Sequence, residues 1–175
     1  DYLFTMTEEV TAQEGLAKYQ EMHQRRAETR CPLQYLLGTQ EFMGYSFIVN
    51  PDVLIPRPDT ETVLEEVINT GIRPGKILDL CTGSGCIAIS LALLLKPDIC
   101  IGTDISRKAL DVAKANGKNL CPMVKFIKSD LFEQVEGTYD LIISNPPYIA
   151  TEECAGLMPE VREHEPMLAL DGKED

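Results

Sequence analysis

The stretch that decides the fold is Asp79-Leu80-Cys81-Thr82-Gly83-Ser84-Gly85-Cys86-Ile87-Ala88, near the middle of a chain of 175 residues. An apolar run typical of a buried strand leads into it, and an apolar run typical of a helix follows it. Gly83 and Gly85 allow the backbone to turn tightly and to approach a ligand closely. The stretch therefore predicts a strand, a glycine turn and a helix around a small-molecule site.

From residue 76 onward, short apolar runs alternate with helical patterns. The sequence predicts strands over residues 76–80, 99–103, 124–127 and 139–144, and helices over residues 86–95 and 107–119. This order is typical of a parallel sheet with right-handed crossovers, which bring the carboxyl ends of the strands to one edge. Ligands of open α/β sheets bind along that edge, so the site is expected there.

Two acidic residues follow the second and third predicted strands. Asp104 comes about 20 residues after the glycines, where a carboxylate can accept hydrogen bonds from both ribose hydroxyls. Because Ser106 can cap the next helix, Asp104 is expected to be free to face the ligand. Asp130 lies where an adenine amino group would need an acceptor, although it can also cap a short helix. These features fit any nucleoside-containing cofactor, NAD included.

The fourth predicted strand runs directly into Asn145-Pro146-Pro147-Tyr148. Proline has no N–H group, so this segment offers carbonyl acceptors in an extended shape with few competing donors. The Asn145 side-chain oxygen and the Pro146 carbonyl oxygen can each accept one hydrogen of a planar NH2 group, while Tyr148 stacks on its π-system. The segment is predicted to aim an amide or aromatic amino nitrogen at an electrophile beside the glycine turn.

The amino-terminal part carries different patterns. Residues 8–29 are polar helix formers with scattered apolar positions and predict a helical arm, and residues 35–53 predict a β-hairpin. Two prolines make residues 55–58 extended, after which Asp59 or Thr60 is expected to cap a helix reaching about Thr70. We therefore expect an arm over residues 1–33, a hairpin and linker helix over 34–75, and a ligand-binding domain over 76–175.

Charge and cysteine content exclude several classes of protein. The chain holds 28 acidic and 16 basic residues, a net charge of -12, which argues against affinity based on indiscriminate phosphate contacts. Residues 76–151 are neutral, with 8 acidic and 8 basic residues, so both flanks are acidic. No apolar run approaches the roughly 20 residues of a membrane helix. The six cysteines lack a CxxC pair and predict reduced, mostly buried thiols of a cytosolic protein without a zinc site.

Together, the glycine turn, Asp104 and Asn145-Pro146-Pro147-Tyr148 resemble S-adenosylmethionine-dependent amino-methyltransferases. Three further blocks are similar to the peptide chain release factor glutamine methyltransferases, the HemK family, and the resemblance runs from about residue 25 to the last residue. The blocks are Arg30-Cys31-Pro32-Leu33-Gln34-Tyr35-Leu36-Leu37-Gly38, Phe42-Met43-Gly44-Tyr45-Ser46-Phe47 and Leu54-Ile55-Pro56-Arg57-Pro58-Asp59-Thr60-Glu61.

The resemblance implies a Rossmann-like class I methyltransferase fold of the α/β class, with a mostly parallel sheet preceded by a helical arm and a hairpin. It implies methyl transfer from S-adenosylmethionine to the glutamine side-chain amide in the Gly-Gly-Gln loop of release factors, with S-adenosylhomocysteine as product. The arm would help to recognise the protein substrate. The expected enzyme is a cytoplasmic monomer that binds neither membranes nor, stably, nucleic acid.

The same resemblance assigns residues to the site. The segment of residues 145–148 would receive the substrate amide, and the segment of residues 57–61 would pack over the cofactor. The implied catalytic residues are Asn145, Pro146, Pro147 and Tyr148. The implied cofactor-binding residues are Asp79, Cys81, Thr82, Gly83, Ser84, Gly85, Asp104, Ile105, Asp130, Leu131, Arg57 and Asn145. No metal ligand is implied.

Two departures from the family pattern stand out. Cys81 occupies the place where the family commonly has the first glycine of the turn, so one backbone position must tolerate a side chain. The sequence also ends where the family pattern continues into roughly three more strands. We therefore expect an incomplete record of a longer protein, whose sheet is left with an unpaired edge.

Three other functions compete with this one. Enzymes that methylate the exocyclic amine of adenine in DNA or RNA use the same two-acceptor chemistry, but they need a basic surface around the pocket. An NAD-dependent Rossmann oxidoreductase would explain Gly83, Gly85 and Asp104 but not residues 145–148. A non-catalytic binding module would transfer no methyl group at all. His23 and His164 have no role under any of these hypotheses, and the tail from Glu152 is expected to be loop and helix surface.

Overall fold

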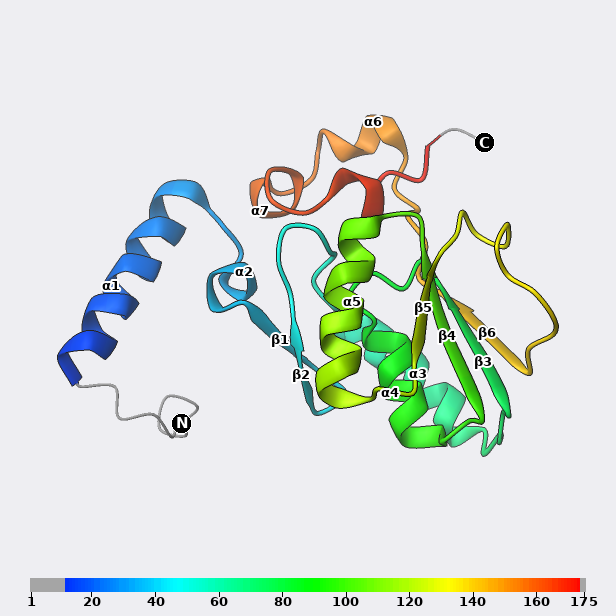
Figure 1. Ribbon diagram of the computed structural model, residues 1–175. Helices are drawn as coiled ribbons and strands as arrows, with labels where there is room; N and C mark the ends of the chain where they lie inside the picture. The colour runs from blue at the N-terminus through cyan, green and yellow to red at the C-terminus, as the bar shows by residue number, and fades with distance from the viewer. Residues whose placement is uncertain (1–11, 174–175) are drawn as a thin grey trace.

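The computed structural model describes residues 12–173, with a four-stranded parallel sheet at its centre (Figure 1). The strands are β3 (Lys76–Leu80), β4 (Ile99–Asp104), β5 (Lys125–Lys128) and β6 (Leu141–Ser144), in the spatial order β5-β4-β3-β6. Leu80 at the end of β3 pairs with Thr103 on one side and with Ser144 on the other. The carboxyl ends therefore meet at one edge, and the predicted parallel α/β fold is confirmed.

Two helices connect the first three strands of this sheet in chain order, one between β3 and β4 and one between β4 and β5. They are α4 (Cys86–Leu95) and α5 (Arg107–Leu120), which pack on the sheet and on each other. α4 is apolar on nearly all sides because it lies between the sheet and other elements, and most of its residues are buried. The Ser106 hydroxyl accepts a hydrogen bond from the Ala109 backbone N–H (3.2 Å), so the predicted cap of α5 is confirmed.

The hydrophobic core extends beyond the sheet and its connecting helices. Phe42 and Phe47 of the hairpin and Leu64 of α3 (Pro58–Asn69) belong to the same buried cluster as Ile77 of β3 and Ile89 of α4. The two phenylalanine rings meet edge to face, with centroids 6.1 Å apart. The hairpin and α3 thus complete the core beneath the carboxyl edge, and they hold residues 49–57 beside that edge.

The hairpin is shorter than the sequence predicts. Its strands are β1 (Thr39–Phe42) and β2 (Tyr45–Ile48), whereas Tyr35 belongs to the short helix α2 (Leu33–Leu37). The predicted start of the hairpin at residue 35 is therefore wrong. Gly38, with a φ of 78°, ends α2 by donating its N–H to the Gln34 carbonyl (2.7 Å), so the helix turns directly into the strand.

The start of α3 also differs from the prediction. Its first residue is Pro58, and Arg57 occupies the N-cap position without a side-chain cap. Neither Asp59 nor Thr60 is the cap, because proline suits the first helical position, where a missing N–H costs no hydrogen bond. Asp59 instead lies in the first turn, where a carboxylate interacts favourably with the helix dipole.

The amino-terminal arm is the helix α1 (Ala12–Thr29), which extends away from the rest of the molecule at the left of Figure 1. The predicted arm is confirmed over these residues, and its predicted start at residues 8–11 lies outside the described residues. None of the side chains described in α1 is buried, and the apolar Leu16 and Tyr19 are 57% and 60% exposed. α1 therefore presents a partly apolar surface to solvent.

After β6 the chain folds back over the carboxyl edge of the sheet (Figure 1, orange to red). This tail contains α6 (Thr151–Cys154), α7 (Pro159–Arg162) and a short 3-10 helix, η2 (Met167–Ala169). A bridge between Ile149 and Asp171 closes it, with Ile149 N–H donating to Leu170 (3.1 Å) and Gly172 N–H donating to Ile149 (2.9 Å). The tail was predicted to be surface, but Cys154, Glu165 and Leu170 are buried.

All six cysteines are free thiols and five of them are buried, as predicted. Burial raises the pKa of the Cys86 and Cys100 thiols to about 12. Within residues 12–173, no helix has both the length and the apolar character needed to cross a bilayer.

Candidate functional site

The loop between β3 and α4 is a tight turn above the carboxyl edge of the sheet. Cys81, Gly83 and Gly85 have positive φ angles of 57°, 54° and 81°. A Cβ added to Gly83 would meet no atom within 4 Å, whereas a Cβ on Gly85 would lie 3.0 Å from the Phe126 ring. Gly83 therefore leaves the ligand side of the turn open, and Gly85 allows α4 to pack closely against its neighbours.

Asp79 supports this turn from beneath. Its Oδ2 accepts hydrogen bonds from the Thr82 hydroxyl (2.6 Å) and from the Ala88 backbone N–H (3.2 Å), which ties the turn to the first turn of α4. The carboxyl group is fully buried, and burial raises its pKa to about 7. Asp79 does not line the cavity described below, so it can act on a ligand only through the shape of the turn.

Asp104 is more constrained than the sequence suggested. Although Ser106 caps α5, the Asp104 carboxylate is not free, because it accepts hydrogen bonds from the backbone N–H groups of Gly83 and Ser106 (both 2.9 Å). Asp104 also lines the cavity described below, and its contact with a ligand stays a prediction. Each carboxylate oxygen has a second acceptor position, so Asp104 can hold the glycine turn and still accept a hydrogen bond from a ligand hydroxyl.

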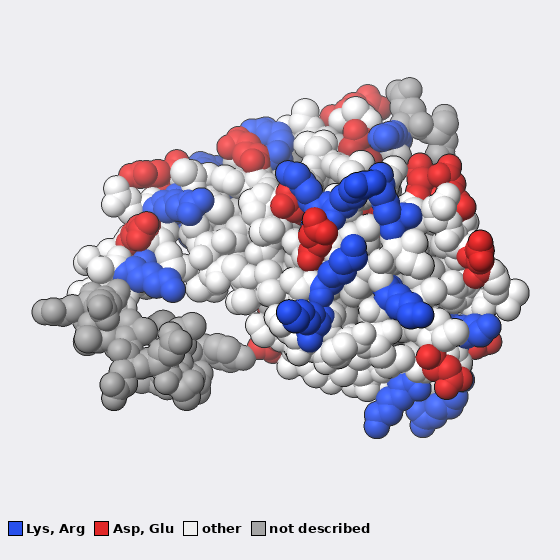
Figure 2. Space-filling model, in the orientation of Figure 1, with Lys and Arg blue, Asp and Glu red and all other residues white. Residues whose placement is uncertain are grey.

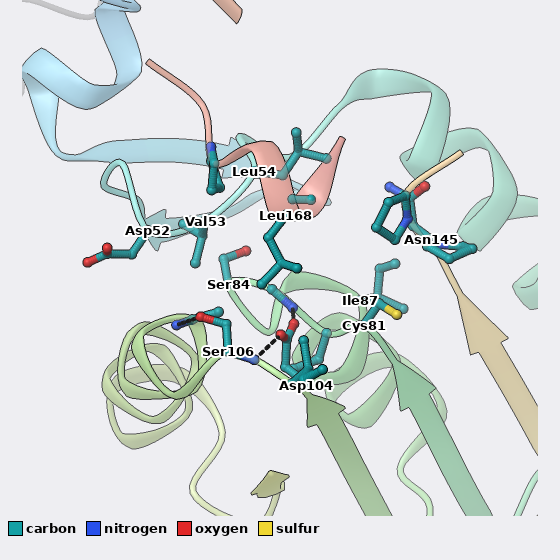
Figure 3. A pocket seen from close by; sticks show the side chains of 18 of the residues that line it. Asp52, Val53, Leu54, Cys81, Ser84, Ile87, Asp104, Ser106, Asn145 and Leu168 are labelled. Carbon is teal, nitrogen blue, oxygen red and sulfur yellow. Dashed lines mark hydrogen bonds between the residues drawn. The ribbon is translucent and has the colours of Figure 1, made fainter. Parts of the chain in front are cut away.

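The turn, Asp104 and the segment after β6 enclose a cavity of about 440 Å³, which Figure 3 shows from close by. This volume is in the range of pockets that hold small-molecule ligands. Most of the predicted site residues line it, namely Arg57, Cys81, Thr82, Gly83, Ser84, Asp104, Ile105, Asp130, Leu131, Asn145, Pro146 and Pro147. Asp79, Gly85 and Tyr148 do not.

Asn145 and Pro146 lie between this cavity and a neighbouring one of about 370 Å³. In Figure 3 the Asn145 side chain is across the pocket from Asp52 and Val53. Its amide makes no hydrogen bond to any residue in the range 12–173, so both its oxygen and its NH2 group are available. Tyr148, 80% exposed, lines only the second cavity. The acceptor groups thus stand at the boundary of two spaces, one of which faces the glycine turn.

Several residues that close the cavity were missed by sequence reasoning. Leu168 of the tail projects into the pocket in Figure 3, and Asp52 and Val53 close another side of it. The tail also contributes Pro166, Ala169, Asp171, Gly172 and Lys173. For Asp52 and Val53, their position just before the block at residues 54–61 was an available signal. For the tail there was none, because its sequence is typical of an acidic surface.

Sequence comparisons find relatives over almost the whole of this chain. The chain is 45% identical over 163 residues to the release factor glutamine methyltransferase of Geobacter sulfurreducens, covering 93% of this chain and 57% of that protein. It is 43% identical over 178 residues to the enzyme of the same name from Koribacter versatilis, covering 99% of this chain and 63% of that protein. The chain thus spans about three fifths of the length of these relatives.

Among solved structures, the hMettl16 catalytic domain in complex with the MAT2A 3'UTR hairpin 6 superposes with a TM-score of 0.54. That match covers 89% of this chain and 56% of the other at 17% sequence identity, and it supports the Rossmann-like methyltransferase fold. The methyltransferase small domain family matches residues 58–161, which is more than half of the chain and includes the glycine turn, Asp104 and residues 145–148. The chain therefore belongs to the methyltransferase small domain family.

Proposed function

We propose that this protein transfers a methyl group from S-adenosylmethionine to the side-chain amide nitrogen of the glutamine in the Gly-Gly-Gln motif of peptide chain release factors. The observation that carries the proposal is the Asn145 amide, which has no hydrogen-bond partner among the described residues and lies with Pro146 between the cavity at the glycine turn and a second cavity. The names of the relatives support the choice of substrate. A release-factor substrate would put the enzyme in the cytoplasm, where translation terminates.

The charges around the larger cavity suit this cofactor. Four carboxylates line it, from Asp52, Asp104, Asp130 and Asp171, and two cations, from Arg57 and Lys173. S-adenosylmethionine carries a sulfonium and an ammonium charge, one carboxylate, and a ribose with two hydroxyls. An acidic lining with a separate cation matches that pattern. The residues present therefore fit the cofactor, which when bound would supply an electrophilic methyl group.

The chain's own contribution is to position the nucleophile. The Asn145 Oδ1 and the Pro146 carbonyl oxygen would each accept one hydrogen of the glutamine amide, and Tyr148 would stack on its flat face. An amide nitrogen is a weak nucleophile because its lone pair is delocalised, so aligning it and polarising its N–H bonds lowers the barrier. The cofactor would supply the methyl group for the new N–C bond as its own C–S bond breaks. The nitrogen would release one proton to solvent, and S-adenosylhomocysteine would remain.

The test is direct methylation. The chain is incubated with S-adenosylmethionine and a bacterial release factor, and the Gly-Gly-Gln peptide is examined by mass spectrometry. We expect one methyl group on the glutamine and none on a release factor whose motif glutamine is replaced by glutamate. Equal methylation of both substrates, or of neither, would contradict the proposal.

One observation favours the adenine alternative. Figure 2 shows Lys and Arg side chains gathered over α5 and β5, although the count over residues 76–151 is balanced. The exposed basic residues there are Arg107, Lys108, Lys114, Lys118, Lys125 and Lys128. A basic face of this kind can contact phosphates. Methyl transfer to adenine in an oligonucleotide, together with a gel shift that weakens with salt, would support that alternative over release-factor methylation.

A further inference from the structure

Glu165, in the tail, is a buried acid that no part of the proposed mechanism uses. Its side chain is 1% exposed, and its Oε1 lies 2.5 Å from Nη2 of Arg57, whose side chain is 39% exposed. The other oxygen, Oε2, is buried and has no hydrogen-bond partner among residues 12–173. Glu165 and Arg57 are 108 residues apart in the sequence, so only the return of the tail brings them together.

A buried carboxylate that forms a hydrogen bond through only one of its oxygens contributes little to the stability of the fold. Removing a charge from water costs more than one contact returns unless the remaining acceptor positions are also filled. The pair does, however, restrict the arginine strongly, because a long flexible side chain is held by one end of its guanidinium group. The remaining N–H groups of Arg57 are left for other acceptors.

Arg57 occupies a particular place. It lines both cavities, and with Lys173 it supplies the cationic side chains among the described residues that line the larger one. Its backbone is fixed as the N-cap residue before Pro58, so the side chain leaves a rigid point at the start of α3. Lys173, by contrast, is exposed and lies near the end of the described chain. Arg57 is therefore the better placed of the two to bind an anionic group reproducibly.

We propose that Glu165 is a positioning residue that holds the Arg57 guanidinium toward the carboxylate of the cofactor's amino-acid end. This inference rests on the proposed function, because it takes S-adenosylmethionine as the ligand. Arg57 would bind the carboxylate with the N–H groups that Glu165 leaves unused, and Glu165 would not contact the ligand. The tail would then contribute to cofactor affinity through an ion pair as well as by covering the cavity.

The test uses two ligands that differ only at the amino-acid end. S-adenosylhomocysteine carries the carboxylate, whereas 5′-methylthioadenosine has the same nucleoside and thioether but no amino-acid group. Calorimetric titration of Glu165→Gln should show S-adenosylhomocysteine binding weakened by about tenfold or more, with 5′-methylthioadenosine binding changed less than about twofold. Glu163→Gln is the matched control, because it breaks the exposed pair with Arg162 (2.8 Å) in the same segment, and it should change neither affinity.

Each outcome has a clear meaning. Equal weakening of both ligands in Glu165→Gln would indicate a merely structural role and would overturn the inference, as would no change in either. If a single variant fails to fold, the double variant Arg57→Met with Glu165→Gln leaves no unpaired buried charge and should bind only 5′-methylthioadenosine with its original affinity. Failure of the unchanged protein to bind either ligand would overturn the proposed function as well, whereas selective failure in the variants concerns Glu165 alone.

Discussion

Asp79 carries a carboxyl group whose pKa burial raises to about 7, and this single residue makes stability depend on pH. In the unfolded chain the group has its usual pKa near 4, so between about pH 4 and 7 the folded state retains a proton that the unfolded state releases. The free energy of unfolding therefore falls as pH rises through this window. Relative to Asp79→Asn, which stays neutral, the protein should lose about 2.5 kcal/mol between pH 5 and pH 8.

Urea unfolding of both proteins at several pH values measures this difference. The amide oxygen in Asp79→Asn can still accept the hydrogen bonds from Thr82 and Ala88, so the two proteins should be most alike at low pH. Asp111→Asn, at an exposed position of α5, is the control and should follow the unchanged protein. Parallel pH profiles for the unchanged protein and Asp79→Asn would contradict the assignment.

In the proposed mechanism, Asn145 is the residue that aligns the substrate amide. Replacing it with alanine removes one of two acceptors for the substrate amide but leaves the glycine turn and Asp104 in place. Methyl transfer should fall by about 10² or more, while the affinity for S-adenosylhomocysteine changes less than about twofold. Single-turnover rates and calorimetric titration measure the two effects separately.

The matched control for this substitution is Asn119→Ala, an exposed amide on α5. It should leave both the rate of methyl transfer and the affinity unchanged. Near-normal methyl transfer by Asn145→Ala would remove Asn145 from the mechanism.

Cys81 adopts a φ of 57°, which L-residues other than glycine rarely adopt. Glycine would relieve this conformation at the cost of a more flexible unfolded chain, so Cys81→Gly should raise the free energy of unfolding by about 0.5–1 kcal/mol. Cys100→Gly, in the buried strand β4, should lower it. Denaturant unfolding of both variants checks the opposite signs, and a loss of stability in Cys81→Gly would show that the thiol packing outweighs the backbone strain.

At the scale of elements, the bridge between Ile149 and Asp171 joins the tail to the segment of residues 145–148 that follows β6. A Cβ added to Gly172 would lie 3.1 Å from the Pro147 carbonyl oxygen and 3.1 Å from the Tyr148 Cα. Gly172→Ala should therefore displace residues 145–148, the acceptor segment, and lower the rate of methyl transfer about tenfold. The affinity for S-adenosylhomocysteine should change less, because the glycine turn and Asp104 are untouched.

Gly156→Ala provides the comparison within the same tail, since its added Cβ would meet only the Glu153 carbonyl oxygen, at 3.4 Å. Gly156→Ala should leave the steady-state rate of methyl transfer unchanged, so the rates of the two variants should differ about tenfold. Similar rates for both would show that the bridge does not position the acceptor segment.

The elements of the sheet were accessible from sequence because their signals are local. The predicted strand at residues 76–80 and helix at 86–95 coincide with β3 and α4, and the Ser106 cap is where the motif placed it. The errors came where neighbours decided the outcome. Tyr35 lies in the helix α2 and not in the hairpin. The Tyr35 hydroxyl donates a hydrogen bond to the Val53 carbonyl oxygen (2.6 Å), 18 residues away, and this contact fixes the position of α2.

At the scale of the whole molecule, the cavity is assembled from segments far apart in the sequence, from Asp52 to Lys173. A ligand that fills it should stabilise the entire fold. At a hundred times its dissociation constant, S-adenosylhomocysteine should raise the free energy of unfolding by about 3 kcal/mol. Denaturant unfolding with and without the ligand measures this.

NAD at the same concentration serves as the comparison ligand, because an NAD-dependent oxidoreductase was the competing hypothesis for the glycine turn. It should leave the unfolding transition unchanged. Stabilisation by NAD and not by S-adenosylhomocysteine would reverse the choice of cofactor.

By itself, the sequence determined the α/β class, the glycine turn, and the positions of Asp104 at the end of β4 and of Asn145 directly after β6. Each of these depends on residues close together in the chain. The tertiary structure alone decided that the tail closes the cavity, that Glu165 meets Arg57, and that basic side chains gather over α5 and β5 although residues 76–151 are neutral in sum. The reason is physical: hydrophobic periodicity and turn chemistry act locally, whereas ion pairs and cavity walls depend on chain segments that only folding brings together.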